Sequence, residues 1–496
     1  MEASRSSAQR NAASVLPEPV GATTSACRPA CAAVGAAKAP ANQSRVAGEK
    51  RSSAVTGPIM RPTPDRFASC SGRPDGHDGP MTTAERTGAA QRRVLAVLVV
   101  AQLLGGVGVA TGIALASLAA ADLSGSDVVG GAALTAVVCG TAVAALPVSR
   151  LAARSGRRPA LVLGYGTGAL GAALSVVALA LGSWPLMLLA LLPFGAATAA
   201  GLAARFAATD LADPGRRARS LGVVIWAVTV GAVAGPNLAA PMQGVAGAFG
   251  LVPTAGPFLL SAVAFGVAAA VVAVGLRPDP LVLARALAPD AGAEPTGGRA
   301  RGAVRTVRAH PAAVLAIGSI ALAHLAMVGL MSLTPVHMDH GGASLQLVGL
   351  VISLHVAGMY VLSPVFGLLA DRWGRRPVLA LGAALLVAAG LVAGPAGPTD
   401  SVMLTTGLVL LGLGWSAALV AGSAELTDAV PLADRARVQG LSDVTMSVAG
   451  ALGGVLAGVV VAVASFAALG LAVAVIAAPV LVFVLLGGRR RTPAPG

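Results

Sequence analysis

The feature that most constrains this chain is a series of apolar stretches of about 20 residues, the length at which a helix crosses the hydrocarbon core of a bilayer. They begin near residue 94 and are separated by short polar connections. The twelve stretches are 94–118, 128–149, 160–181, 186–208, 220–242, 254–276, 311–335, 347–368, 377–396, 401–423, 439–463 and 466–487. The sequence therefore predicts an all-α membrane protein with twelve transmembrane helices.

The composition excludes several other classes of protein. Of the 496 residues, 55% are hydrophobic and 11% are charged, whereas about a quarter of the residues of a soluble domain are charged. A soluble enzyme, a disordered chain and a coiled coil are therefore excluded. The net charge of +14 is spread in small groups between the apolar stretches, unlike the clustered basic face of a nucleic-acid-binding protein. We expect a lipid bilayer, and no nucleic acid, as a partner.

Sequence signals for cofactors, metals and catalysis are missing. Neither lysine, Lys38 or Lys50, stands in the G-x-x-x-x-G-K pattern that holds nucleotide phosphates. The four cysteines have no zinc-ligand spacing and no disulfide pattern. The hydrolase patterns H-E-x-x-H and G-x-S-x-G do not occur. We therefore expect no cofactor, no metal site and no enzymatic activity.

Arginine is distributed unevenly over the connections. The connections 119–127, 182–185, 243–253, 336–346, 397–400 and 464–465 contain neither Arg nor Lys. The alternate connections, and both flanks of the apolar region, each contain two or more Arg. Because cytoplasmic loops of membrane proteins are enriched in basic residues, we expect a multi-pass protein of the plasma or inner membrane with both termini in the cytoplasm.

Two long segments without apolar stretches divide the chain. The N-terminal segment is rich in Ala, Ser, Pro and Arg, which is typical of a disordered tail. Alternatively it is a mis-annotated extension, since Met81 begins what reads as a normal short N-terminus. The predicted parts are a tail (1–91), a six-helix bundle (92–276), a cytoplasmic linker (277–310), a second six-helix bundle (311–487) and a cytoplasmic tail (488–496).

The two halves are repeats of each other. They align without gaps at a constant offset of 218 residues, at which Asp210 and Arg217 match Asp428 and Arg435. Parallel repeats of six spans occur in transporters whose two bundles move around a binding site near the membrane midplane. The sequence thus predicts two six-helix pseudo-repeats with a site between them.

A charged motif follows the eighth apolar stretch. It has the pattern G-x-x-x-D-R-x-G-R-R and consists of Gly367, Asp371, Arg372, Gly374, Arg375 and Arg376. The Gly permits a tight helix exit, the Asp can accept hydrogen bonds from a neighbouring helix N-terminus, and the Arg side chains can pair with acids. We expect a latch that holds one gating state, and the alternative is a basic anchor alone.

The matching loop after the second stretch departs from this pattern. Ser149 and Ala153 replace its Gly and its Asp. We therefore expect a weaker latch in the first half. The residues that this copy retains are Arg154, Gly156, Arg157 and Arg158.

Small residues mark the fifth stretch. Gly222, Gly231, Gly235 and Pro236 form the pattern G-x8-G-x3-G-P. Such glycines allow close approach of helices and the proline kinks the span, although ordinary packing of small residues would look similar. The pairs Asp210/Arg217 and Asp428/Arg435 share an acid-x6-Arg spacing, and we expect them to form charge clusters with the Arg-rich loops.

These motifs resemble those of the major facilitator superfamily. The glycine motif is similar to that of its twelve-span proton-coupled drug antiporters, and the acid-x6-Arg pairs look like those of its sugar porters. The resemblance covers 92–487 and implies a secondary active transporter. It implies a monomeric, proton-coupled exporter of small lipophilic compounds that works by alternating access; the alternative is a sugar or metabolite exporter of the same superfamily.

Three ionisable side chains in the apolar stretches are candidates for proton coupling, because such groups are costly in a membrane. His324 and His355 lie near the middle of their stretches, and histidine changes charge near neutral pH; the alternative for each is a neutral, structural role. Asp443 lies one turn inside the eleventh stretch, where it carries protons or caps the helix near the two arginines at its start. Arg205, near the end of the fourth stretch, is expected to extend its charge toward water, and the alternative is an anion-binding or gating role.

The substrate cavity is expected to contain few polar groups. No carboxylate lies in the middle of the first six stretches, which favours a hydrophobic or weakly polar substrate over a multiply charged one. Methionine side chains suit varied apolar ligands. The candidate lining residues are Gln102, Thr111, Thr141, Asn237, Met327, Met331, Met359, Trp415 and Ser416.

Overall fold

The structure of the chain is a computed structural model that describes residues 83–288 and 300–488, and every regular element in these ranges is a helix. Within the described residues, twelve candidate spans are long and apolar enough to cross a membrane. The predicted all-α class and number of spans are thereby confirmed. Most of the predicted N-terminal tail, including the alternative start at Met81, lies outside the described residues.

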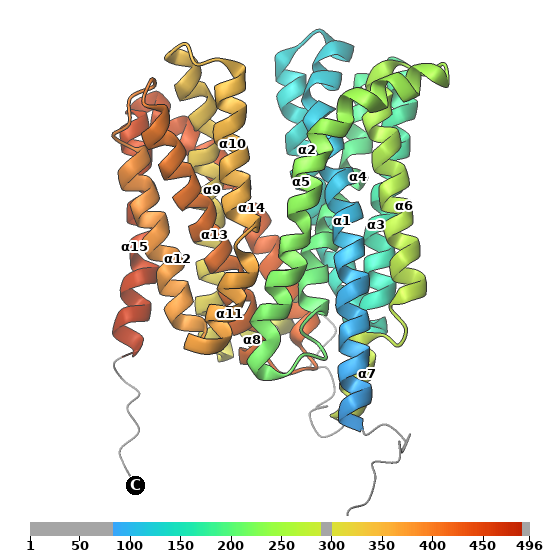
Figure 1. The fold of residues 1–496 in the computed structure, drawn as a ribbon, viewed down its shortest axis with the longest axis vertical. Coiled ribbons are helices and arrows are strands. Elements are labelled where there is room, and N and C mark those ends of the chain that lie inside the picture. Colours follow the sequence, from blue (N-terminus) through green and yellow to red (C-terminus); the bar gives the residue numbers. More distant parts are fainter. Residues whose placement is uncertain (1–82, 289–299, 489–496) are drawn as a thin grey trace, which may run out of the picture. The chain divides into compact units, whose positions relative to one another are not determined.

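The first six spans form one group of helices (Figure 1). They are α1 (Thr83–Ser124), α2 (Asp127–Ser155), α3 (Arg157–Ala180), α4 (Trp184–Ala207), α5 (Arg217–Ala248) and α6 (Gly256–Gly275), with the short 3-10 helices Pro214–Arg216 and Pro253–Ala255 before α5 and α6. Helix α1 begins inside the predicted tail, because Ala, Glu, Gln and Arg favour helix there and Gln91 donates a 2.8 Å hydrogen bond to the carbonyl of Ala208.

The last six spans form the second group. They are α9 (Pro311–His340), α10 (Leu345–Tyr360) with α11 (Ser363–Trp373), α12 (Arg375–Ala393), α13 (Ser401–Ala429), α14 (Arg435–Val463) and α15 (Phe466–Gly488). The predicted single stretch 347–368 is therefore two helices. Pro364 is the physical reason, since proline has no N–H to donate and its ring displaces the preceding turn.

Two short helices lie in the segment between the groups, α7 (Pro280–Leu287) and α8 (Ala300–Ala309). Asp279 caps α7 by accepting hydrogen bonds from the backbone N–H groups of Leu281 and Val282. The same carboxylate accepts a 2.6 Å bond from the backbone N–H of Arg158 at the start of α3. One acid thus fastens this segment to the first bundle.

Small residues bring the helix backbones into contact. A Cβ atom added at Gly171 or at Gly140 would overlap with the backbone of α4. Lipid tails are as apolar as the side chains, so helices in a membrane are held together by close van der Waals contact rather than by a hydrophobic driving force. The stripes of Gly and Ala provide that contact within each bundle.

The two bundles meet mainly through α5 with α11 and α2 with α14. Gly222 of α5 contacts Ser363 of α11, and Gly440 of α14 contacts Ser149 of α2. These contacts lie toward the end of the helices at which the Arg-containing loops emerge. We call this end of the two bundles the arginine-rich end. It is defined by Arg154, Arg217 and Arg375, which stand at the helix ends beside the loops.

Candidate functional site

A cavity of about 360 Å³ lies between the two bundles. Its wall is formed by α1, α3, α4 and α5 of the first bundle and by α9, α10 and α13 of the second. Most lining side chains are apolar. The polar ones are Gln102, Tyr165, Thr198, Arg205, Tyr360 and Trp415. An apolar cavity with a few convergent polar groups is the usual form of a small-molecule site.

The structure brings five of the predicted lining residues together on this cavity. They are Gln102, Met327, Met331, Met359 and Trp415. Although Gln102 lies 225 positions before Met327 in the chain, both face the same space because α1 and α9 stand on opposite sides of it.

The structure places the other four in different surroundings. Thr111 donates to the carbonyls of Val107 and Gly235, and Thr141 donates to that of Gly195, so both hydroxyls serve helix contacts within the first bundle. Asn237 is exposed and Ser416 is buried. Trp415 lines the cavity while Ser416, its neighbour, does not, because successive residues of a helix point about 100° apart.

His324 is hydrogen-bonded to Trp415, a residue that lines the cavity. The indole Nε1 of Trp415 donates a 2.9 Å hydrogen bond to Nδ1 of His324. An indole N–H can only donate, so Nδ1 carries no proton and the neutral ring has its hydrogen on Nε2. A second proton on this ring would have to occupy the position that Trp415 uses. His324 therefore orients Trp415.

His355 joins two helices of the same bundle. Its side chain is fully buried, and Nδ1 lies 2.7 Å from the carbonyl of Leu408 in α13. A carbonyl can only accept, so Nδ1 carries the hydrogen, and Nε2 is buried without a partner among the described residues. The hydrogen bond lies inside the second bundle and does not cross its boundary with the first.

Asp443 and Arg205 form an ion pair across the bundle boundary. Nη2 of Arg205 in α4 lies 2.6 Å from Oδ1 of Asp443 in α14, and their side chains are 2% and 5% exposed. The prediction that Arg205 extends toward water is wrong. Asp443 supplies its counter-charge, and the ring of Phe206 lies 4.7 Å from its guanidinium.

The alternative role of Asp443 as a cap near the arginines of its own helix is not observed. Arg435 donates to the carbonyl of Val430, and Arg437 pairs with Asp434. Asp443 is directed into the boundary between α14 and α4 instead, where Arg205 also lines the cavity.

Buried polar side chains continue from this pair toward the arginine-rich end. One turn before Asp443, the amide oxygen of Gln439 accepts a 2.6 Å bond from Arg157. Arg157 pairs with Asp210 at 2.7 Å, and both side chains are buried. The matching pair of the second repeat, Arg375 with Asp428, is half-buried. The repeat therefore preserves the ion pair within each bundle but not its surroundings.

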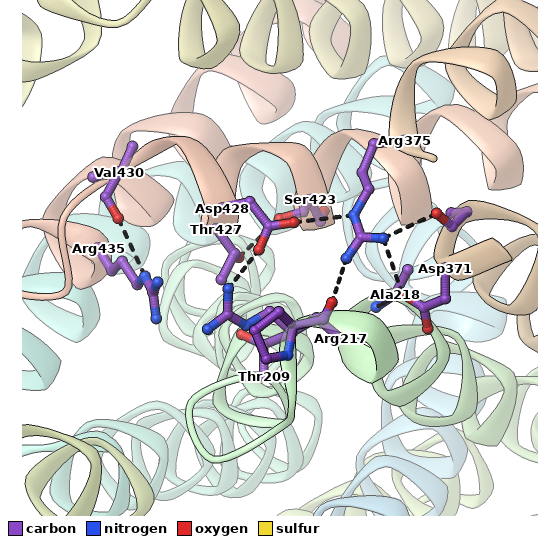
Figure 2. A network of polar contacts seen from close by, with 12 residues as sticks. Thr209, Arg217, Ala218, Asp371, Arg375, Ser423, Thr427, Asp428, Val430 and Arg435 are labelled. Atoms are coloured by element: carbon purple, nitrogen blue, oxygen red, sulfur yellow. Dashed lines mark hydrogen bonds and ion pairs between the residues drawn. The ribbon is translucent and has the colours of Figure 1, made fainter. Parts of the chain in front are cut away.

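A second set of contacts holds α11 against the start of α5. The carboxylate of Asp371 accepts hydrogen bonds from the backbone N–H groups of Ala218 (3.1 Å) and Arg219 (2.8 Å). Arg375 donates to Asp428 and to the carbonyl of Pro214. Arg217 pairs with Asp428 across the boundary at 2.5 Å. Figure 2 shows Arg375 between Asp428, at the end of α13, and the loop before α5.

The remaining motif residues have local roles or none. Gly156 and Gly374 have φ values of 98° and 95°, which side chains rarely adopt, so glycine is required in both loops. Arg158 donates to the carbonyl of Ala273, within the first bundle. Arg154 and Arg372 are exposed and form no ion pair among the described residues. Arg376 lies 3.6 Å from Glu425.

Sequence reasoning missed both tyrosines. The chain has two, Tyr165 and Tyr360, and both line the cavity. The hydroxyl of Tyr165 donates a 2.9 Å bond to the amide oxygen of Gln102. Their scarcity and their position inside apolar stretches were signals that could have found them, because a phenol in a membrane needs a hydrogen-bond partner or a polar cavity.

Comparison with known proteins identifies the family. The sequence pattern of the Major Facilitator Superfamily matches residues 97–346 and 316–496. The chain is 38% identical over 403 residues to YddS of Bacillus subtilis (strain 168), described as an uncharacterized MFS-type transporter, covering 80% of this chain and 91% of YddS. The chain belongs to the Major Facilitator Superfamily. It is therefore a multi-pass membrane transporter of small molecules, and not an enzyme.

Two other similarities are weaker. The riboflavin transporter RfnT of Brucella anthropi is 28% identical over 364 residues, covering 72% of this chain and 86% of RfnT. The crystal structure of the human organic anion transporter MFSD10 matches with a TM-score of 0.62 at 16% identity, covering 79% of this chain and 99% of the other. The latter similarity shows a shared superfamily fold.

Asp371→Asn is expected to weaken the closed arginine-rich end of this superfamily member. Asn retains one acceptor oxygen but no charge at the N-terminus of α5, a loss of about 1 kcal/mol or about fivefold in the closed population. Accessibility of a cysteine introduced at Ser149 would measure the change. Asp400→Asn is the matched control, because Asp400 also accepts from a backbone N–H, that of Gly397, but lies at the opposite end. Equal effects of both substitutions would contradict the prediction.

Proposed function

We propose that this chain is a proton-coupled exporter of small lipophilic compounds that works by alternating access. Its main support is the ion pair between Arg205 and Asp443, which stands beside the cavity and crosses the boundary between the bundles. We further propose that the arginine-rich end faces the cytoplasm, in keeping with the enrichment of Arg in its loops. Both termini are then cytoplasmic, in a cell membrane.

The moving bodies in this proposal are the bundles 92–276 and 311–487, joined by 277–310. Opening the arginine-rich end requires the contacts of α5 with α11 and of α2 with α14 to separate. It also requires that Arg205 leave Asp443 and that Asp371 leave the N-terminus of α5. The buried pair of Arg205 and Asp443 is the strongest of the polar contacts that hold the closed state. Arg157 with Gln439, Arg217 with Asp428 and Asp371 with the start of α5 also cross the boundary.

Asp443 is the proposed coupling residue. Separating a buried ion pair leaves uncompensated charges and costs about 3–5 kcal/mol. A proton on Asp443 removes the negative charge and leaves Arg205 buried without a counter-charge, which destabilises the closed state and favours opening of the arginine-rich end. In this proposal His324 and His355, the other two candidates, orient Trp415 and join α10 to α13. Proton-driven transport that survives replacement of both histidines would agree with this division of roles.

A second candidate function is the export of a metabolite. It is favoured by the similarity to RfnT, whose name states that it transports riboflavin. Met327, Met331 and Met359 offer polarizable surface for a ring system as well as for a drug-like compound. The charged pairs that look like those of sugar porters lie at the arginine-rich end, away from the cavity lining, so they give no support to a sugar as substrate.

The test uses the full-length protein in proteoliposomes with an imposed pH gradient and a fluorescent lipophilic dye. A gradient of about one pH unit is worth about 1.4 kcal/mol per proton, enough for a roughly tenfold concentration ratio of a neutral substrate in one-to-one exchange. We expect the dye to move against the proton flow and to redistribute when a protonophore collapses the gradient. If the rate and direction of dye movement do not depend on the pH gradient, the transport is not proton-coupled.

A further inference from the structure

The two walls of the cavity differ in chemistry. The second bundle contributes thioether and aromatic side chains: Met327, Met331, Met359, Tyr360 and Trp415. The first bundle contributes the hydrogen-bonding groups of Gln102, Tyr165, Thr198 and Arg205. A ligand between the walls therefore meets mainly polarizable surface, with the phenol of Tyr360, on one side and most of the hydrogen-bonding groups on the other.

The polar wall is organised by one face of α4. Thr198, Gly201 and Arg205 are spaced i, i+3 and i+7, which places them on the same side of the helix. A Cβ atom added at Gly201 would lie 3.0 Å from the amide oxygen of Gln102 in α1. Because Gly201 has no side chain, the amide of Gln102 approaches α4 closely, and the three polar groups border one region of the cavity.

Several donors on this wall have no acceptor. The amide oxygen of Gln102 accepts the hydrogen bond of the Tyr165 hydroxyl. The NH₂ group of Gln102 is therefore the part of this amide that can donate to a ligand. The hydroxyl of Thr198 and two guanidinium nitrogens of Arg205, Nε and Nη1, are buried without a partner among the described residues. Buried donors without acceptors are costly, so a ligand that supplies acceptors here gains free energy.

The charge of this wall is already balanced. Asp443 pairs with Arg205 through Nη2, and Nε and Nη1 have no partner in the part of the chain that the structure describes. A carboxylate ligand would bring a second negative charge to a single guanidinium in a low-dielectric site, whereas a neutral carbonyl or ring nitrogen adds none.

We infer that the cavity selects a neutral, flat ring system with carbonyl or ring-nitrogen acceptors along one edge and apolar surface elsewhere. The inference rests on the proposed function, in which this cavity is the transport site. The same ion pair links proton binding to substrate binding. A proton on Asp443 releases the guanidinium of Arg205, which then no longer stands where it can donate to the acceptors of the substrate. Substrate and proton then favour different states of one ion pair, as exchange requires.

The test compares three compounds with the same three-ring skeleton by equilibrium dialysis against purified full-length protein. Anthraquinone, used as its 1,2-isomer, has two neighbouring carbonyl acceptors on one edge, anthracene has none, and anthracene-2-carboxylate carries a charge. We expect anthraquinone to bind at least about tenfold more tightly than the other two, after subtraction of binding to empty detergent micelles.

Variants show whether the polar wall causes the preference. Thr198→Val keeps the shape and removes the hydroxyl, and Gln102→Leu removes the amide; each is expected to weaken anthraquinone binding about three- to tenfold and to leave anthracene binding unchanged. Thr334→Val is the matched control, since this buried hydroxyl bonds to Leu330 within α9, away from the cavity lining.

Three results would overturn the inference: equal binding of anthraquinone and anthracene, a preference that both variants retain, or tightest binding of the carboxylate. These failures are distinct from failure of the proposed function. If pH-driven dye export persists without the preference, the substrate class is wrong and the exporter stands. If the preference is found without pH-driven export, the cavity selects as inferred and the proposed function fails.

Discussion

Asp443→Asn is expected to abolish proton-driven transport and to depopulate the state that is closed at the arginine-rich end. Asn has the shape of a protonated Asp but cannot lose a proton, and it leaves the buried charge of Arg205 without a counter-charge. Loss of one partner from a buried pair costs about 3–5 kcal/mol, which corresponds to a change of roughly 100- to 5,000-fold in population. This is the largest effect that we expect from any single substitution.

The population can be measured with a cysteine at Ser149, whose side chain contacts Gly440 in the closed boundary. Native cysteines, including Cys139, are first replaced by alanine. Labelling by a maleimide should be slow in the parent protein and fast with Asp443→Asn. Transport assays in parallel should show dye movement that no longer depends on the pH gradient. Retention of gradient-driven transport by this variant would remove Asp443 from the coupling mechanism.

A double substitution separates charge from packing. Arg205→Met with Asp443→Leu replaces the ion pair by apolar side chains, an exchange that is often neutral for stability because no buried charge remains. We expect it to restore slow labelling at the Ser149 position but not proton-driven transport. Rapid labelling of the double variant would indicate that the shape of the pair, and not its charge, holds the bundles together.

The second large effect is expected from glycines of α5, where one substitution has different consequences at three positions. A Cβ atom at Gly231 would overlap with the backbone of α1 at Gly106, inside the first bundle, whereas one at Gly222 would overlap with Ser363 of α11 across the boundary. Overpacking against backbone costs about 1–3 kcal/mol. Gly231→Ala should therefore lower the melting temperature. Gly222→Ala should instead shift the population away from the closed state by roughly 5- to 150-fold.

Gly244→Ala is the control on the same helix. Nothing lies within 4 Å of the added Cβ atom there, so the change should raise helix stability slightly. Melting curves and labelling at the Ser149 position together distinguish the three variants. If Gly222→Ala and Gly231→Ala lower the melting temperature equally and leave labelling unchanged, the glycine motif serves packing alone.

The candidate site was predictable to a limited extent. Gln102, the three methionines and Trp415 were selected by residue type, and they line the cavity. Thr111 and Thr141 were selected by the same reasoning, yet their hydroxyls bond to carbonyls within the first bundle. A polar residue in a span can face a cavity or a neighbouring helix, and the direction depends on helix rotation, which residue type does not reveal.

Several properties of this protein follow from the sequence by itself. Local composition sets the twelve spans, the repeat at a constant offset and the separation of Arg onto alternate loops. The reason is that each segment that crosses a bilayer must by itself have the length and the low polarity that the bilayer requires. The glycines of the two loops, Gly156 and Gly374, likewise stand where the backbone needs a positive φ. These features identify a transporter architecture without any knowledge of contacts.

The partners of the buried charges were decided only by the tertiary structure. Arg205 and Asp443 are 238 positions apart, and local pattern predicts a proton carrier or a cap for Asp443 and contact with water for Arg205. They meet because α4 and α14 are adjacent at the bundle boundary and are rotated toward each other. Away from water, an ion pair has a lower free energy than two isolated charges. This preference depends on both helices at once, so the sequence around either residue does not reveal it.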